Sequence, residues 1–362
     1  MTIQNMNDLS LEQTADAIAA FGHEQCVLVQ GHMGNGKTSI LKMLAARFPN
    51  HIPCYFNRVT KDLGDLSIPS LNTEEGFVTY LPNEEFGIHL NKPLIIMWDE
   101  WSKANQSVKN GTMVTMQERM VGTKKLPEGS MQFATGNLGT EGVGDIVPAH
   151  GRNRMTIITV RKSTSDELIA HGINNDWDQF VLGFIREFPQ ILQGFEDVEH
   201  AQDNPYINHP KEQRSSFVTP RSLEAASNIL KKRDKIDEQT LTACLAGTIG
   251  VRGALDLMTF VALADQLPSL ESIKKDPMNA VLPTSASVIV MVVYRALGAM
   301  SRDWVDAWMT YMTRPEFSKE ATGLFADGVR ANSYVHRNIV MQNKKFTEWA
   351  IANNHMFSAD KV

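Results

Sequence analysis

The chain has 362 residues, of which 43% are hydrophobic and 21% charged, values typical of a globular protein with a large core. Its formal net charge of −6 at pH 7 argues against a protein that binds nucleic acid through overall basic character. The three cysteines, Cys26, Cys54 and Cys244, are too far apart for a disulfide framework or a zinc-binding pattern.

The first residues contain no basic region followed by an apolar stretch, so no signal peptide is expected. The longest apolar run, residues 288–294, is too short to span a bilayer. We therefore expect a cytoplasmic protein that does not enter a membrane. Since no H-E-x-x-H pattern occurs, we expect no metal other than nucleotide-bound Mg²⁺.

A phosphate-binding loop is predicted near the start of the chain. Ser10 and Gln13 match a capping box for a first helix to about residue 20. The apolar residues 26–30 predict a buried strand, and helical periodicity follows over 40–48. Between them, GHMGNGKTS at 31–39 fits the pattern G-x-x-x-x-G-K-[ST], and a strand before it and a helix after it are the context that supports the match.

This loop has the residue types needed to hold a triphosphate. Its glycines let backbone N–H groups turn toward phosphate oxygens, Lys37 can reach the terminal phosphates, and the Thr38 hydroxyl can bind Mg²⁺. The dipole of the following helix favours an anion at its N-terminus. The predicted ATP-binding residues are Gly31, Met33, Gly34, Asn35, Gly36, Lys37, Thr38 and Ser39.

Further strands are expected along the next part of the chain. Residues 52–59 and 93–100 read as strands, 104–120 as a helix, and 120–137 as a hairpin leading into a fourth strand; 155–160 is a fifth strand. The loop-rich segment 60–90 contains a candidate extended arm, GFVTYL at 76–81. Five short strands separated by helices predict an α/β fold, an αβα sandwich around a five-stranded parallel sheet.

Acidic and amide side chains follow two of these strands. Asp99 and Glu100 end the strand at 93–100, and we assign Asp99 to the Mg²⁺ shell and Glu100 to the activation of water. Asn137 ends another strand, and ligands of parallel sheets bind at the carboxyl ends of strands. Asn137 is therefore predicted to orient the water or contact the terminal phosphate.

Three arginines are candidates to stabilise charge on a transferring phosphoryl group. Arg152 and Arg154 precede the fifth strand, where they are badly placed for a nucleotide on their own chain but can reach that of a neighbour. Arg221, in the TPR sequence at 219–221, is the third candidate.

The chain turns helical after residue 160. The pattern predicts three domains: the nucleotide-binding domain at 1–160, a helical lid subdomain at 161–268 and a helical extension at 269–362. The lid is expected to contain a helix that starts at Thr219 and Pro220. The apolar stretch at 284–300 is expected to form core or a subunit contact.

Taken in order, these motifs resemble those of AAA+ ATPases, and within them the MoxR-like, dynein-related branch. DEWSKA at 99–104 is similar to the branch's D-E-I-N-[RK]-A, and residues 118–137 resemble its hairpin and sensor strand. NRM at 153–155 stands where the family has D-R-F, which favours Arg154 over Arg152 as the arginine that acts across subunits. The similarity covers about residues 25–235.

The resemblance implies a ring, usually a hexamer, with ATP and Mg²⁺ at each subunit interface. It implies that the insert at 60–90 faces the pore or a partner. Members of this branch commonly act with a protein that carries a von Willebrand factor A domain, in chaperone-like remodelling, and some relatives occur in phages.

The sequence leaves three alternatives open. A DNA-associated motor of the same superfamily is disfavoured, because the chain is acidic overall and its sequence does not interleave basic with aromatic residues. A nucleotide-gated scaffold would bind ATP while hydrolysis is incidental. A P-loop kinase is disfavoured, since an Asp-Glu strand end with a later Asn suits attack by water better than binding of an acceptor.

Overall fold

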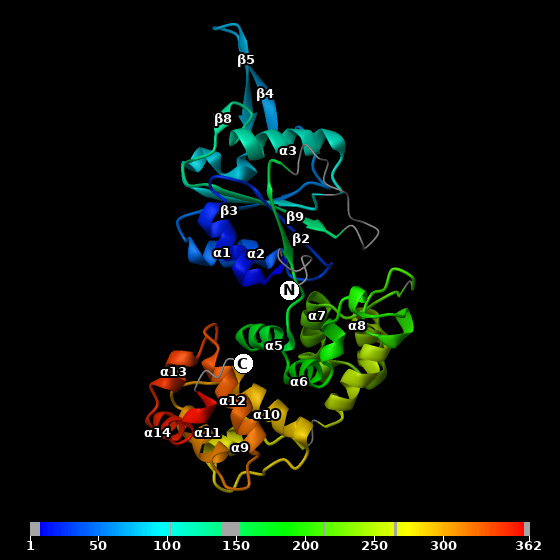
Figure 1. The fold of residues 1–362 in the computed structure, drawn as a ribbon, viewed down its shortest axis with the longest axis vertical. Helices are drawn as coiled ribbons and strands as arrows, with labels where there is room; N and C mark the ends of the chain where they lie inside the picture. The colour runs from blue at the N-terminus through cyan, green and yellow to red at the C-terminus, as the bar shows by residue number, and fades with distance from the viewer. Residues whose placement is uncertain (1–7, 102, 139–152, 213, 264–265, 358–362) are drawn as a thin grey trace. The chain divides into compact units, whose positions relative to one another are not determined.

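The computed structural model describes residues 8–101, 103–138, 153–212, 214–263 and 266–357 (Figure 1). The chain forms two compact units, residues 1–163 and 164–362. The apolar cores of the described residues are separate as well: two clusters lie within residues 15–160, and a third spans 168–346. The boundary expected between the lid subdomain and the helical extension, at residues 268 and 269, stays a prediction.

The first unit is built on a six-stranded sheet in the order β1-β10-β2-β9-β6-β3, and every neighbouring pair is parallel. Its strands are β1 (Asp8–Leu9), β2 (Val27–Gly31), β3 (Ile52–Asn57), β6 (Leu94–Asp99), β9 (Met131–Asn137) and β10 (Thr156–Val160). The α/β class and the five predicted strands are confirmed. The sixth, β1, has only two residues, too few to give a periodic signal in the sequence.

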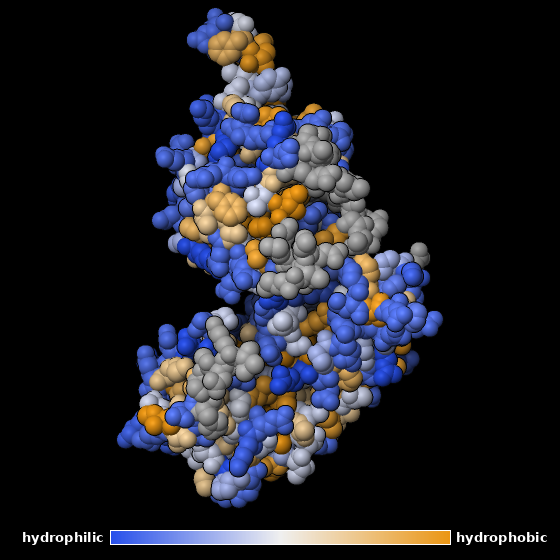
Figure 2. All heavy atoms as spheres, in the orientation of Figure 1, coloured by the Kyte–Doolittle hydropathy of each residue, from blue (hydrophilic) through white to orange (hydrophobic). Residues whose placement is uncertain are grey.

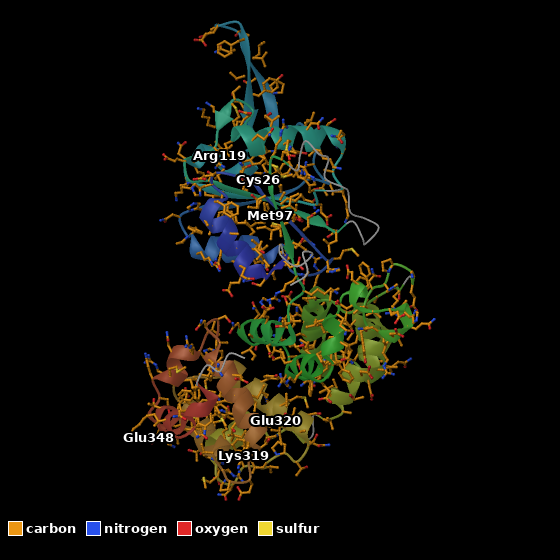
Figure 3. The ribbon with its side chains drawn as sticks, viewed as in Figure 1. Cys26, Met97, Arg119, Lys319, Glu320 and Glu348 are labelled. Carbon is orange, nitrogen blue, oxygen red and sulfur yellow. The ribbon has the colours of Figure 1, made fainter. Side chains whose placement is uncertain are left out.

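Helices cover both faces of this sheet. α1 (Leu11–Phe21) and α2 (Ser39–Arg47) pack on one face, where Ile18 and Leu44 contact a cluster that includes Met97. α3 (Gln106–Glu118) covers the other face, in the cluster that includes Cys26. Figure 3 labels Met97 and Cys26, one from each cluster. The predicted αβα sandwich is confirmed.

Local signals in the sequence explain where these helices start. The side chains of Ser10 and Gln13 form the predicted capping box of α1. The Asn105 side chain accepts a hydrogen bond from the backbone N–H of Val108 and so caps α3. α2 differs, because its N-cap residue Thr38 makes no side-chain cap hydrogen bond.

A two-stranded hairpin extends from the first unit (Figure 1). It consists of β4 (Ser67–Asn72) and β5 (Phe77–Pro82), paired antiparallel. The predicted arm at 76–81 therefore has a partner strand within the segment expected to be rich in loops. A smaller hairpin, β7 (Met120–Val121) with β8 (Lys124–Lys125), contacts β5. The segment between β5 and β6 contains two short 3-10 helices, Glu84–Phe86 and Ile88–Leu90.

The regular elements of the second unit are helices joined by loops, and among its described residues there is one isolated bridge, between His209 and Glu212. Its core is shared by helices from both predicted segments, the lid and the extension. The helices are α5 (Ser165–Asn174), α6 (Gln179–Glu187), α7 (Pro220–Leu230), α8 (Glu238–Val261), α9 (Leu270–Lys275), α10 (Ala286–Gly298), α11 (Val305–Met312), α12 (Lys319–Arg330), α13 (Arg337–Met341) and α14 (Lys344–Ala352).

Helix α8 has 24 residues and is, by length and composition alone, apolar enough to cross a membrane. Of the apolar 18-residue stretch within it, 39% is buried. It is not one continuous helix, because Gly250 has φ 83° and ψ 158° and interrupts it. Leu241, Leu245 and Leu257 from both of its parts lie in the core of the second unit. We read α8 as a kinked core helix.

Candidate nucleotide site

The carboxyl ends of β2, β9, β6 and β3 bring the predicted site together. The strand register pairs Gly31 with Asn137 and Asn57 with Asp99, so the residues that end these strands lie side by side at one edge of the sheet. This is the edge at which parallel α/β sheets bind ligands. The adjacency follows from strand order, which no local pattern in the sequence specifies.

The phosphate-binding loop between β2 and α2 is built as its motif requires. Gly34 and Gly36 have φ values of 71° and 77°, which are accessible to glycine at little cost. The buried Asn35 side chain donates hydrogen bonds to the carbonyls of Val160 at 3.4 Å and Arg161 at 2.9 Å. Asn35 thereby fixes the loop to the end of β10, and the sequence analysis gave it no such role.

Lys37 and Asn137 meet in this structure. The Lys37 ammonium donates to Asn137 Oδ1 at 3.1 Å, and also to the carbonyls of Gly31 at 2.7 Å and His32 at 2.8 Å. The Ser39 hydroxyl donates to the Gly36 carbonyl at 2.6 Å. The cation is therefore held at the mouth of the loop, directly beside the amide at the end of β9.

Asp99 is held by side chains from the strands on both sides of β6. Its Oδ2 accepts a hydrogen bond from the Tyr55 hydroxyl of β3 at 2.7 Å, and its Oδ1 accepts one from the Thr135 hydroxyl of β9. Burial, followed by the bond to Asp99, raises the pKa of Tyr55 to about 12, so the phenol is a donor at neutral pH. These two bonds fix the plane of the carboxylate.

Glu100 has a backbone conformation that is unusual for its residue type. Its φ is 57°, in the left-handed region that costs a non-glycine residue roughly 1–2 kcal/mol. Its carboxylate forms an ion pair with the Lys103 ammonium at 2.9 Å. Such strain is often kept at functional sites, where it sets the direction of a side chain.

Arg58 and Trp101 pack against each other beside this strand end. Arg58 is 0% exposed, and its guanidinium carbon lies 4.0 Å from the centroid of the Trp101 ring. None of its three guanidinium nitrogens has a hydrogen-bond partner among the residues that the structure describes. Burial lowers the pKa of Arg58 to about 9, which still leaves a cation at pH 7, held by the face of the ring.

Of the three arginine candidates, Arg154 is described in the same unit as this cluster and is not part of it. Arg154 is exposed and precedes β10, so it lies at the amino-terminal edge of the sheet, opposite the edge that carries Lys37 and Asn137. Arg221 is exposed in the first turn of α7, in the second unit. Arg152 lies outside the described residues. Their roles toward a nucleotide stay predictions.

Tyr55, Thr135, Lys103 and Arg58 were missed by the sequence analysis. Thr135 could have been found, because residues two apart in a strand share a face and Asn137 was already a candidate. Tyr55 could not, because its contact with Asp99 depends on β3 being the neighbour of β6. The same holds for Arg58, because its contact with the Trp101 ring depends on the fold.

The residues present fit a nucleotide with Mg²⁺. Gly34 and Gly36 turn the loop, Lys37 supplies a cation, and the Thr38 hydroxyl is not used as a helix cap. Thr38 and the immobilised carboxylate of Asp99 supply the oxygen ligands that Mg²⁺ prefers. The other loop residues, Met33 and Ser39, are positioned by the same turn.

No protein-family model matches the chain, and no characterised protein sequence matches it. Solved structures give partial similarity. The RuvB Holliday junction branch migration motor of Thermotoga maritima is 13% identical with a TM-score of 0.36, over 74% of this chain and 75% of that one. A putative ATPase from Cytophaga hutchinsonii is 12% identical with a TM-score of 0.31, over 86% and 78%.

NtrX from Brucella abortus, solved in complex with ADP, is 12% identical with a TM-score of 0.36, over 96% of this chain and 68% of that one. TM-scores below 0.5 mark a partial likeness of fold, so no function is taken from these proteins.

Proposed function

We propose that the protein is an ATPase of the AAA+ class and of MoxR-like type, which works as a ring and uses ATP hydrolysis to remodel a protein partner. One observation carries the ATPase part of this proposal. Strand β9 contributes both Asn137, which binds the Lys37 ammonium, and Thr135, which binds the Asp99 carboxylate. A phosphate-binding cation and a metal-binding carboxylate are thereby joined through one strand.

Each residue has a part in such a reaction. Lys37 and the loop N–H groups bind phosphate oxygens, while Thr38 and Asp99 hold Mg²⁺, which neutralises phosphate charge when bound. Glu100 accepts the proton of the attacking water, and Asn137 orients that water. Tyr55 and Thr135 keep the Asp99 carboxylate in one orientation.

The assignment of Glu100 is tested by Glu100→Gln. We expect this variant to bind ATP normally and to lose about 10²- to 10⁴-fold in turnover, the range for removal of a general base. Glu84→Gln, at an exposed position in the same unit, is the control and should hydrolyse ATP at the normal rate. Near-normal hydrolysis by Glu100→Gln would reject the assignment.

The proposal of a ring is supported by the position of Arg154, which lies at the edge of the sheet opposite the phosphate-binding loop of the same chain. We expect Arg154→Ala and Glu100→Gln to be inactive separately. Mixing them should restore part of the activity, because some interfaces then combine an intact Glu100 with an intact Arg154 from the neighbour. Failure of mixing to restore activity would argue against a site shared between subunits. The same test with Arg152→Ala shows which of the two arginines acts across the interface.

The β4–β5 hairpin is the feature that supports a protein partner. Six of its apolar side chains are exposed, and Figure 2 shows apolar surface near the tip of this projection, next to hydrophilic surface. They are Ile68, Leu71, Phe77, Val78, Tyr80 and Leu81. Exposed apolar clusters mark interaction sites, and the adjacent Glu74 and Glu75 at the turn disfavour DNA phosphates. We propose that the hairpin contacts the partner, for which a von Willebrand factor A-domain protein is the candidate.

The hairpin proposal is tested by Phe77→Ser with Val78→Ser. This variant should keep its basal ATPase rate and lose the proteins that co-purify with Glu100→Gln in the presence of ATP. Unchanged co-purification would reject the hairpin as the contact. ATPase activity stimulated by DNA, and falling steeply with salt, would instead indicate a DNA-associated motor.

A further inference from the structure

A cavity in the second unit is separate from the nucleotide site. Its volume is about 670 Å³, within the range of small-molecule sites. Four helices line it: α5, α6, α10 and α12, drawn from both halves of the unit. Its apolar lining includes Ile169, Ile173, Leu297 and Leu324.

Tyr294 supplies a polar group to this apolar lining. The residue is only 3% exposed, and its hydroxyl has no hydrogen-bond partner among the described residues. Burial raises the pKa of Tyr294, so the phenol is a donor at neutral pH, and charges on Arg186, Asp166 and Asp327 act on it. By contrast Tyr334, which also lines the cavity, has its hydroxyl bound to the Leu297 carbonyl at 2.7 Å. Tyr294 is therefore the phenol left open to a ligand.

Two ion pairs from different helices complete the lining. Arg186 of α6 pairs with Asp166 of α5 at 3.2 Å, and Arg330 pairs with Asp327 within α12 at 3.5 Å. All four side chains are exposed, so a ligand can compete for them without burying an unpaired charge. Each guanidinium has five N–H donors, and the pair with Asp166 uses only Nη1 of Arg186.

We propose that this cavity binds a short zwitterionic peptide of about tripeptide size with apolar side chains. The four charges sum to zero, so a ligand with a single charge would face one repulsive residue for every attractive one. A molecule with opposite charges at its two ends can meet a carboxylate at one ion pair and a guanidinium at the other. Its apolar side chains fit the Ile and Leu lining, and a peptide carbonyl can accept from the Tyr294 hydroxyl.

The charge requirement is tested by calorimetric titration of the full chain with the tripeptide Leu-Ala-Leu and its N-acetylated, C-amidated and doubly blocked forms. We expect the zwitterion to bind tightest and each blocked end to weaken binding about 2- to 5-fold, the range for an exposed ion pair. No binding of any form at about 1 mM, or equal binding of all four, would overturn the proposal.

The site is tested by Tyr294→Phe. Since its hydroxyl has no hydrogen-bond partner in the part of the chain that the structure describes, the variant should keep its melting temperature and bind the tripeptide about 5-fold more weakly, as expected for one lost hydrogen bond. Tyr311→Phe is the control, because its hydroxyl donates to the Val281 carbonyl at 2.7 Å away from the cavity lining. It should lose stability and keep its affinity. Unchanged affinity in Tyr294→Phe would place the ligand elsewhere.

Discussion

The Asp99 side chain is held by hydrogen bonds from the strands on both sides of β6. Neutral hydroxyl groups orient the carboxylate, and the carboxylate itself supplies the negative charge. Its two carboxylate oxygens accept hydrogen bonds from Tyr55 and Thr135, which belong to different strands. A carboxylate held in this way is preorganised for a metal ion, because little conformational freedom is left to lose on binding. The contribution of Tyr55 is therefore to positioning.

Replacing Tyr55 by Phe should show this positioning role. We expect the Mg²⁺ concentration for half-maximal ATPase activity to rise about 5-fold, since one hydrogen bond to the carboxylate is lost. Turnover at saturating Mg²⁺ should change less. Tyr80→Phe is a matched control, because both tyrosines are 48% exposed. An unchanged Mg²⁺ requirement in Tyr55→Phe would show that Thr135 alone orients Asp99.

Strain at Glu100 gives a second test at the same scale. Glu100→Gly should raise the free energy of unfolding by about 1 kcal/mol, because glycine adopts a φ of 57° without the steric penalty, while hydrolysis is lost. Glu100→Gln should lose hydrolysis without this gain. Urea unfolding of both variants compares them, and equal stabilities would show that the backbone at this position stores no strain.

At the scale of elements, local signals decide where helices begin, while contacts between elements decide where they break. The caps at Ser10, Asn105 and Thr219 lie in the sequence next to the helices they start. The break in α8 at Gly250 has no such signal. A Cβ at Gly250 would lie 2.8 Å from the Ser216 carbonyl oxygen, so the chain passing beside it explains why glycine is needed there.

A pair of glycines in α8 tests this account. Gly250→Ala should destabilise the protein by at least about 1–2 kcal/mol, because alanine is strained at a φ of 83° and its Cβ overlaps Ser216. Gly247→Ala should stabilise it by up to about 1 kcal/mol, since nothing lies within 4 Å of the added Cβ and alanine is the better helix former. Thermal melts of both variants measure the contrast. A stable Gly250→Ala would mean that the helix closes over the break.

At the scale of the whole molecule, the described residues form two units with separate cores. The phosphate-binding loop, Asp99, Glu100 and Asn137 all belong to the first unit. A ligand that binds only the folded state stabilises the unit that carries its site.

Calorimetric unfolding should therefore show two transitions, of which ADP with Mg²⁺ raises one. At a ligand concentration of 100 times Kd the expected gain is about 2.7 kcal/mol for the first unit. Lys37→Ala should remove the shift and leave the second transition unchanged. A single unfolding transition, shifted as a whole by ADP with Mg²⁺, would show that the two units unfold together.

The sequence by itself determined the parts of this protein that depend on neighbouring residues: the glycine-rich loop between a strand and a helix, the five longer strands, the capped helix starts, and the polar residues at the ends of strands. These follow from periodicity, caps and backbone freedom, which act over a few positions.

Only the tertiary structure decided which strand ends meet. The contacts of Asp99 with Tyr55, of Lys37 with Asn137, and of Arg58 with Trp101 join residues 44, 100 and 43 positions apart, and each depends on strand order or on packing between side chains. The cavity around Tyr294 likewise needs four helices to converge. Burial and adjacency belong to the folded chain, and no local pattern of residue types fixes them.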